Sequence, residues 1–498
     1  MSGAATFAGR WAEAVAAGRD RPFLAFEAPS GAVTAWTYGE FDDVVARAAG
    51  ALASMGVRKG AAVHVALTNC PTFVAAWLAA ARLGAWIVPS DPGSTAPELA
   101  GHITRTCPVV GLCGAARADA YTEAAAGRAA VIEVDEAGPV VALAGAPVAG
   151  DVVAPRDRLA VMFTSGTTSA PKGVEVTQAN YAFAGDVMAA AAALRADDRQ
   201  LVVLPLFHAN AQYYSFASAI SAGASVALVH AFSASRFLEQ AARHGATCAS
   251  LFAAPMRMIL ARGAAPVEGL RLRHVWYAQN VTGEQYDTLA GLFGCRPRQL
   301  YGMTETIPAV LSNRALAPVP DSMGVPTLGC EVALRAADGG PVPDGETGEV
   351  VVRGEPGVTV FAGYLDDPVT TEASFIDGWF RTGDLAHRNG GRYFFDGRRS
   401  DVLKVAGENV SVVEVEAVLS EHPSVLEAAV VGEPDPIRDE VPVGFVVLQP
   451  GAAAVSTGEL LQWCESRLAK AKRPVRIDIV DELPRTSVGK IRKFLLKR

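Results

Sequence analysis

The sequence predicts an α/β protein with a large N-terminal domain of layered α/β subdomains plus a β-rich subdomain, followed by a small α+β C-terminal domain. Apolar runs typical of buried strands alternate with helical patterns up to about residue 320, which indicates largely parallel sheets. Glycine and proline turns then separate short strands, as in β-rich structure. A compact pattern of helix and strand begins at residue 401. We therefore expect domains at residues 1–400 and 401–498.

The N-terminal domain contains a capped helix and an apolar window. Thr37 can cap a helix over residues 41–52, because Glu40 lies three residues later, as in a capping box. Residues 73–89 form the most apolar window, but it contains Arg82 and is too short to span a bilayer comfortably. This window predicts a core helix followed by a strand.

Further apolar runs predict the strands of both domains, with helical patterns between them. The predicted strands lie at residues 62–67, 86–89, 159–163, 201–204, 225–229, 274–277, 348–353, 425–431 and 444–448. Residues 110–156 are rich in alanine, glycine and valine and predict short strands and a loop. In the C-terminal domain we expect helices over residues 412–419 and 458–471.

Composition excludes several classes of protein. The 498 residues exceed what one hydrophobic core usually contains. A net charge of −8 argues against a general binder of nucleic acid or of anionic membranes. The seven cysteines show no C-x-x-C pair and no zinc-ligand spacing, which favours free, mostly buried thiols in a reducing compartment. Residues 1–10 lack a signal-peptide pattern, so we expect a cytoplasmic protein.

Residues 164–173 give the strongest functional signal. Their sequence is Thr-Ser-Gly-Thr-Thr-Ser-Ala-Pro-Lys-Gly, directly after the apolar run 159–163. Glycine gives conformational freedom, hydroxyl and N–H groups donate to phosphate oxygens, and lysine adds a cation. The candidate phosphate-binding residues are Thr164, Ser165, Gly166, Thr167, Thr168 and Lys172. The usual P-loop motif is absent, and a polar surface turn is the alternative interpretation.

A second motif, at residues 301–306, contains Tyr301, Thr304 and Glu305. A carboxylate near a phosphate loop can hold Mg²⁺ through its oxygens, and a tyrosine can stack on a base. The alternative is the capped start of a helix with a solvated glutamate.

Two further motifs lie towards the end of the chain. Within residues 378–401, Asp384 at a strand end can accept from both ribose hydroxyls, and Arg398 can complete that contact. Two hairpin turns are the alternative, which the Asp-Gly pair at 396–397 favours. Within residues 483–492, Lys490 lies beside a glycine on a basic tail, for which a solvated terminus is the alternative.

The four motifs, in this order, resemble those of the adenylate-forming superfamily of acyl- and aryl-CoA synthetases, luciferases and peptide-synthetase adenylation domains. The resemblance covers about residues 25–495. Residues 204–208 and 407–411 are similar to those of crotonobetaine/carnitine-CoA ligase-like acyl-CoA ligases. In this family a carboxylate and Mg-ATP form an acyl-AMP and pyrophosphate, and a thiol then attacks the acyl-AMP. The resemblance therefore implies ATP, Mg²⁺ and CoA.

The resemblance also implies a role for each candidate residue of the N-terminal part. Residues 164–172 would handle the β- and γ-phosphates, and Thr304 would touch the α-phosphate. Tyr301 would stack on adenine, and Glu305 would bind Mg²⁺. His208 would flank the acyl pocket. Such positioning and charge neutralisation are what adenylyl transfer needs.

The resemblance implies that the later motifs complete the nucleotide site and belong partly to a domain that rotates. Asp384 and Arg398 would hold the ribose, and Lys490 would bridge the attacking carboxylate and the adenosine oxygens. Asp401 matches the family's hinge, so the resemblance implies a mobile C-terminal domain that rotates between the half-reactions. After rotation, Lys404 to Gly407 would face the thiol tunnel in place of Lys490.

The chain departs from its relatives at several places, two of which bear on the acyl pocket and the ribose site; in the phosphate loop, Ser169 replaces a frequent glycine. Gln279 and Asn280 replace tiny residues in the turn before the tyrosine motif, which predicts a shorter, more polar pocket. The alternative is that both amides only satisfy strand-end backbone groups. The spacer from Asp384 to Arg398 is one residue shorter than usual, so both Arg398 and Arg399 are candidates for the ribose contact.

The leading hypothesis is an ATP- and Mg-dependent ligase that joins a small or medium carboxylic acid, polar and aryl acids included, to CoA. Tyr213 and Tyr214 favour a crowded or hydrogen-bonding site over a long lipid channel. One alternative is a diazotase that activates nitrite and diazotises an aryl amine in the secondary metabolism of natural products. Another is an enzyme that loads a carrier protein. The intact Lys490, Glu305 and Asp384 argue against a non-catalytic relative.

Overall fold

The computed structural model describes residues 5–164, 171–405, 408–449, 451, 455–485 and 491–496. The chain forms two compact units, Met1–Val332 with Val352–Phe380 and Ala333–Val351 with Arg381–Arg498. It therefore passes between the units more than once. The domain boundary at residues 400 and 401, with a hinge at Asp401, stays a prediction.

A seven-stranded sheet forms one layer of the first unit, in the order β18-β8-β7-β4-β3-β5-β6. The strands are β3 (Ala62–Ala66), β4 (Trp86–Pro89), β5 (Val110–Gly114), β6 (Ala130–Val134), β7 (Arg158–Thr164), β8 (Lys172–Thr177) and β18 (Gly363–Tyr364). Strands β3 to β7 are parallel, whereas β8 is antiparallel to both its neighbours. Helices α3 (Pro71–Leu83), α4 (Ala96–Thr106) and α5 (Ala118–Ala125) connect the parallel strands, as the βαβ rule requires.

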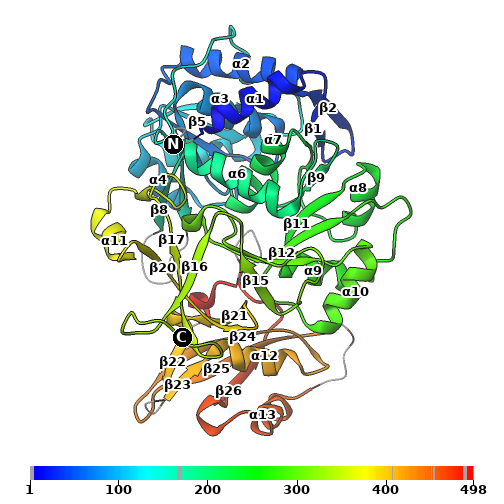
Figure 1. Cartoon of the computed structure of the whole chain (residues 1–498), viewed down its shortest axis with the longest axis vertical. Helices are drawn as coiled ribbons and strands as arrows, with labels where there is room; N and C mark the ends of the chain where they lie inside the picture. Colours follow the sequence, from blue (N-terminus) through cyan, green and yellow to red (C-terminus); the bar gives the residue numbers. More distant parts are fainter. Residues whose placement is uncertain are drawn as a thin grey trace. The chain divides into compact units, whose positions relative to one another are not determined.

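The other strands of the first unit follow the order β15-β14-β13-β12-β11-β9-β10-β1-β2. They are β1 (Pro22–Glu27), β2 (Val33–Thr37), β9 (Arg199–Val202), β10 (Ser225–Val229), β11 (Cys248–Phe252), β12 (His274–Ala278), β13 (Arg298–Tyr301), β14 (Leu311–Ser312) and β15 (Ser322–Pro326). Helices of this unit include α1 (Phe7–Ala17), α2 (Tyr38–Ser54), α6 (Gln178–Ala192), α7 (Ser218–Ala222), α8 (Phe237–Arg243), α9 (Ala253–Ala261), α10 (Gly283–Phe293) and α11 (Pro368–Ala373). Helices α1, α2 and α3 pack together at the N-terminal, blue end of this unit (Figure 1).

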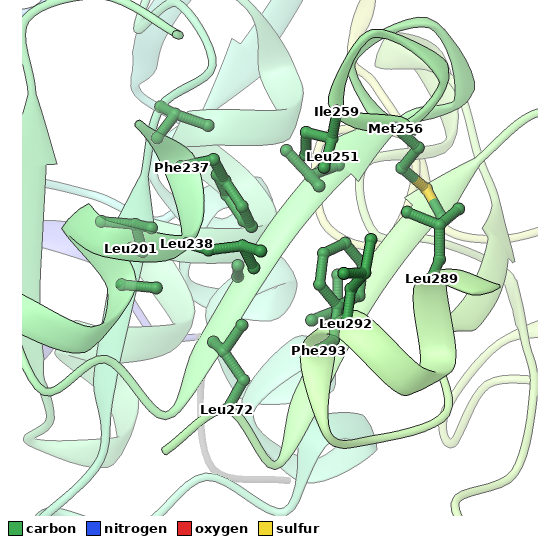
Figure 2. Packing of buried hydrophobic residues seen from close by; sticks show 14 of the residues in the cluster. Leu201, Phe237, Leu238, Leu251, Met256, Ile259, Leu272, Leu289, Leu292 and Phe293 are labelled. Atoms are coloured by element: carbon green, nitrogen blue, oxygen red, sulfur yellow. The ribbon is translucent and has the colours of Figure 1, made fainter. Parts of the chain in front are cut away.

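A continuous apolar core supports strands β9 to β12. Figure 2 shows side chains of α8, α9 and α10 gathered around β11, with Leu251 of that strand among them. Phe237, Leu251, Ile259 and Phe293 are completely buried. Burial of each such side chain contributes about 1.5–3 kcal/mol relative to exposure. The core therefore gives a rigid base to the loops that follow these parallel strands, where ligands bind in open α/β sheets.

The second unit contains two groups of strands. The first group follows the order β16-β17-β20-β21 and the second is a five-stranded sheet in which β26 pairs with β25. The strands are β16 (Glu331–Arg335), β17 (Thr347–Arg353), β20 (Trp379–Asn389), β21 (Arg392–Arg398), β22 (Val402–Val405), β23 (Glu408–Ser411), β24 (Val425–Asp435), β25 (Asp439–Leu448) and β26 (Arg476–Ile479). Helix α12 (Val412–Ser420) packs on β24 and α13 (Thr457–Glu465) on β26 (Figure 1).

The predicted fold class is confirmed, and so is the first helix signal. The capping box forms at the start of α2, where Thr37 Oγ1 accepts from Glu40 N at 3.2 Å and Glu40 Oε2 accepts from Thr37 N at 2.8 Å. The apolar window 73–89 forms most of α3 and then β4, both buried in the first unit.

Two expectations in the C-terminal part are wrong. The helix expected over residues 458–471 ends at Glu465, because the following turn tightens: Arg467 N donates to Cys464 O at 3.1 Å. The Asp-Gly pair at 396–397 is not a hairpin turn but part of β21. The turn lies at Gly390 and Gly391, whose φ angles of 55° and 74° provide the two positive values of a type I′ turn.

Three further findings bear on the expectations from composition. None of the described helices has the length and apolarity to cross a membrane. All seven cysteines are free, and the buried ones are Cys70, Cys113, Cys248 and Cys464. Burial raises the pKa of the Cys70 thiol to about 12. Residues 110–156 also contain α5, which their composition did not predict.

Candidate functional site

The β7–β8 hairpin presents the ends of the phosphate-binding segment. Strand β7 ends at Thr164, β8 begins at Lys172, and the two residues are cross-strand partners. Thr164 Oγ1 donates to Lys172 O at 3.5 Å. The hairpin thus fixes the backbone positions of both residues. Ser165, Gly166, Thr167 and Thr168 lie outside the described residues.

Tyr364 of β18 connects Lys172 with Glu305. Its hydroxyl donates to Glu305 Oε1 at 3.1 Å, and Lys172 Nζ lies 4.8 Å from the centre of its ring. Both Tyr364 and Glu305 are buried, at 8% and 5% exposure. The structure therefore brings residues of the first two predicted motifs together around one tyrosine side chain.

Glu305 lies in a short 3₁₀ helix, η3 (Thr304–Thr306), directly after β13. The alternative of a solvated glutamate is therefore wrong, because this carboxylate is buried. Among the described residues, no group of three His, Cys, Asp or Glu side chains could hold a metal ion. A single carboxylate suits Mg²⁺, which usually keeps water ligands and takes further oxygens from substrate phosphates. The residue fits the predicted ion.

Tyr301 ends β13, and Gly302 follows it in a crowded place. Tyr301 is 9% exposed. A Cβ atom added at Gly302 would lie 2.8 Å from the Tyr214 hydroxyl and 2.9 Å from Pro308 O. Glycine at this position therefore permits a close approach of the backbone to Tyr214.

Gln279 and Asn280 follow β12, the parallel neighbour of β13. Their side chains are exposed. Gln279 has a φ of 73°, in the left-handed region where glycine is favoured. The amides of Asn280 and Gln299 hydrogen-bond at 2.7 Å. One of the two amides thus bonds a side chain, and the more polar pocket stays a prediction.

His208 lies two residues before an unusual helical segment. Residues Asn210–Ala217 form a π-helix, η2, in which every residue is buried. Its Tyr213 hydroxyl donates to Met162 Sδ at 3.6 Å, and burial raises the pKa of both Tyr213 and Tyr214. π-helical turns are frequent at functional sites. Tyr213 and Tyr214 are therefore both buried and neutral at physiological pH, and the crowded acyl site near His208 stays a prediction.

In the second unit, Asp384 and Arg398 face each other across the β20–β21 ladder. Arg398 Nε lies 2.9 Å from Asp384 Oδ1, and Asp384 is buried. Arg399, the other candidate, instead donates through Nη2 to Glu349 Oε2 at 2.9 Å. The two arginines thus have different carboxylate partners.

The remaining candidates lie in the C-terminal part of the second unit. Lys404 is an exposed residue of β22 whose N–H donates to Glu440 Oε2 at 2.9 Å. Lys493 Nζ lies 2.8 Å from Glu416 Oε1 and 3.9 Å from Asp401 Oδ2. Gly407 and Lys490 lie outside the described residues.

Sequence reasoning missed Tyr364 and Glu349. Tyr364 follows a glycine in a two-residue strand, where neither spacing nor charge marks it. The sequence did mark Glu349, because it is an acidic residue within the apolar run 348–353. A carboxylate in a strand that is otherwise buried needs hydrogen-bonding partners.

Two sequence families match this chain. Residues 11–365 match the AMP-binding enzyme family, and residues 414–490 match the AMP-binding enzyme C-terminal domain. Among curated proteins, the crotonobetaine/carnitine–CoA ligases of Salmonella heidelberg (strain SL476) and Salmonella typhimurium are 33% identical over 509 aligned residues, with 96% of each chain covered. The closer resemblance predicted from the motifs is thereby confirmed.

Solved structures agree with this assignment. ATP-bound MatB from Rhodopseudomonas palustris has a TM-score of 0.89 at 26% identity, covering 98% of both chains. The o-succinylbenzoate CoA synthetase MenE from Bacillus subtilis, in complex with its acyl-adenylate intermediate, has a TM-score of 0.86 at 29% identity, again over 98% of both chains. This chain therefore belongs to the AMP-binding family of adenylate-forming enzymes.

Proposed function

We propose that this protein is an ATP- and Mg²⁺-dependent ligase that adenylates a small or medium carboxylic acid and transfers the acyl group to CoA. The grouping of Lys172, Tyr364 and Glu305 supports this most. It brings a phosphate-binding cation close to a buried carboxylate suited to Mg²⁺, as electrostatic catalysis of adenylyl transfer requires. The long match to crotonobetaine/carnitine–CoA ligase supports the choice of reaction.

In the first half-reaction, a carboxylate oxygen of the substrate attacks the α-phosphorus of ATP. The bond from that phosphorus to the bridging oxygen breaks, and pyrophosphate leaves. Thr164 and Lys172 hold the β- and γ-phosphates, and Thr304 contacts the α-phosphate. Glu305 would hold Mg²⁺, which would neutralise charge on the phosphates. Tyr301 stacks on the adenine.

In the second half-reaction, the thiol sulfur attacks the acyl carbon, the bond from that carbon to the phosphate oxygen breaks, and AMP leaves. Asp384 holds the ribose throughout. Lys490 serves the first half-reaction and, after rotation at Asp401, is replaced at the site by residues from Lys404 to Gly407. The compact ammonium group of Lys490 suits the first half-reaction, because negative charge moves there from the carboxylate to the phosphate.

The substrate class follows from the residues near the predicted acyl pocket. His208 lies two residues before the π-helix, Tyr213 and Tyr214 lie within it, and Gln279 and Asn280 follow β12. We infer that these side chains favour a short acid that carries a polar or aryl group over a long aliphatic chain. The enzymes named above act on crotonobetaine or carnitine and on o-succinylbenzoate, which have this character.

The experiment is to measure AMP and pyrophosphate release from Mg-ATP with a panel of acids, with and without CoA. The panel contains short, branched, betaine and aryl acids, and nitrite with aryl amines, with products identified by mass spectrometry. Release of AMP with one acid and formation of its CoA thioester support the proposal. Release with nitrite and an amine, without a thioester, would instead support the diazotase. Adenylation that needs a carrier protein and ignores CoA would support the third candidate.

A further inference from the structure

The arginines beside the predicted ribose site are held by a second buried carboxylate, Glu349 of β17. Its Oε2 accepts from Arg381 Nε at 3.0 Å and Nη2 at 2.7 Å, and from Arg399 Nη2 at 2.9 Å. Its Oε1 accepts from Gly383 N at 3.2 Å. The Glu349 side chain is 5% exposed. A carboxylate with four donors is a strong, well-oriented hydrogen-bond centre.

These donors flank Asp384 in the chain. Arg381 and Gly383 precede it in β20, while Arg399 follows Arg398 at the end of β21. Arg381 is thus three residues from Asp384, and Arg399 follows its cross-strand partner Arg398; Glu349 binds Arg381 and Arg399. Asp384 is paired with Arg398 at 2.9 Å.

Glu349 also fixes the backbone at Asp384. Gly383 has a φ of 74°, and its N–H is held by the Glu349 carboxylate. The next N–H, of Asp384, donates to Thr382 Oγ1 at 3.1 Å, and that hydroxyl donates to Val350 O at 2.8 Å. Two consecutive amides before the Asp384 side chain are therefore anchored to Glu349 and to its neighbour Val350 in β17.

Loss of the Glu349 charge would change both the arginine contacts and the backbone anchoring at Asp384. Two guanidinium groups would lose their carboxylate partner, and a buried carboxylate nearby would then attract them. Asp384 is a buried acid in β20, on the same strand as Arg381 and opposite Arg398, the residue before Arg399. An additional arginine on Asp384 would compete with the ribose hydroxyls for its oxygens.

We propose that Glu349 is a positioning residue for ribose recognition: it holds Arg381 and Arg399 away from Asp384, so that Arg398 is the ribose-side arginine. This inference rests on the proposed function, because it takes Asp384 as the ribose acceptor. Glu349 itself touches no substrate in this scheme. It acts through the backbone and the charge of its neighbours.

The test compares binding of ATP with binding of 2′,3′-dideoxy-ATP, which lacks both ribose hydroxyls, by titration calorimetry on the full chain. For Glu349→Gln we expect ATP affinity to fall about tenfold and dideoxy-ATP affinity by less than about threefold. The preference for ribose therefore shrinks. Glu349→Asp keeps the charge and should restore part of the preference.

Matched variants separate this role from general support of the fold. Asp344→Asn removes an exposed carboxylate that binds Arg388 of β20 at 2.6 Å, and it should leave the preference for ribose unchanged. Arg398→Met should abolish the preference, whereas Arg399→Met should retain most of it. The arginine pair tests the proposal even if Glu349→Gln does not fold.

Several outcomes would overturn the proposal. Equal losses for both nucleotides in Glu349→Gln would show a structural role only, and loss of the ribose preference in Arg399→Met would make Arg399 the ribose partner. A wild-type protein that binds both nucleotides equally would remove the assumed role of Asp384. A wild-type protein that binds no ATP would refute the proposed function itself, which is a distinct result.

Discussion

Lowering the pH from 7 to 5 is expected to destabilise the first unit through two histidines. His64 of β3 is completely buried. Its Nδ1 lies 2.6 Å from the Tyr121 hydroxyl and its Nε2 3.0 Å from Ser90 Oγ, which in turn lies 2.9 Å from His102 Nδ1. Burial lowers the pKa of His64 to about 3 and that of His102 to about 4.

The size of the stability loss follows from the difference between the folded and unfolded pKa values of each histidine. In the unfolded chain both imidazoles titrate near about 6.5. Between that pH and the folded values, the unfolded chain binds protons that the folded chain does not, so stability falls as the pH falls. The loss is about 2 kcal/mol per histidine at pH 5, against about 0.2 kcal/mol at pH 7. Together the two histidines could remove roughly 4 kcal/mol, a large share of the stability of a typical domain.

The assay is thermal and urea unfolding at pH 7, 6 and 5, followed by calorimetry and tryptophan fluorescence. Glutamine does not titrate, so between pH 7 and 5 His102→Gln should lose about 2 kcal/mol less stability than the wild type. His230→Gln, in the same unit but outside this hydrogen-bonded chain, is the control and should behave like the wild type. If a His64→Asn, His102→Gln double variant still loses as much stability as the wild type between pH 7 and 5, this reasoning is wrong.

Three further outcomes are expected. Tyr364→Phe removes the hydroxyl that orients Glu305 and should raise the Mg²⁺ concentration needed for half-maximal ATP binding by about three- to tenfold in calorimetry, whereas unchanged Mg²⁺ dependence would exclude this role. Lys490→Ala should abolish adenylate formation but spare thioester formation from supplied acyl-AMP. Equal loss of both steps would contradict the assignment of Lys490 to the first half-reaction only. Gly302→Ala places a Cβ 2.8 Å from the Tyr214 hydroxyl and should raise the KM for ATP about tenfold or more; wild-type kinetics would show that the backbone can give way there.

Local signals in the sequence were sufficient where they depended on a few adjacent residues. The capping box at Thr37 and Glu40 formed as predicted, because a hydrogen bond between residues three apart needs only a helix turn. The hairpin turn expected at the Asp-Gly pair 396–397 did not form there. Two consecutive glycines nearby form the turn instead, because glycine adopts positive φ at lower cost.

The four motifs likewise identified the family from the sequence alone. Each motif is a short run of residue types that binds a fixed part of a nucleotide, and their order along the chain is independent of packing. The family match over residues 11–365 and 414–490 confirms that inference. The residues assigned to individual phosphates and to the ribose stay predictions.

Only the tertiary structure placed Tyr364 between Lys172 and Glu305, and Glu349 beside Arg399. These partners are far apart in sequence, on strands whose neighbours are decided by sheet topology. Local propensity contains no information on such contacts, since it is the pairing order of strands that brings the side chains within hydrogen-bonding distance. The sequence by itself therefore determined which chemical groups the protein has and which family it belongs to. Packing determined which carboxylate each cation meets.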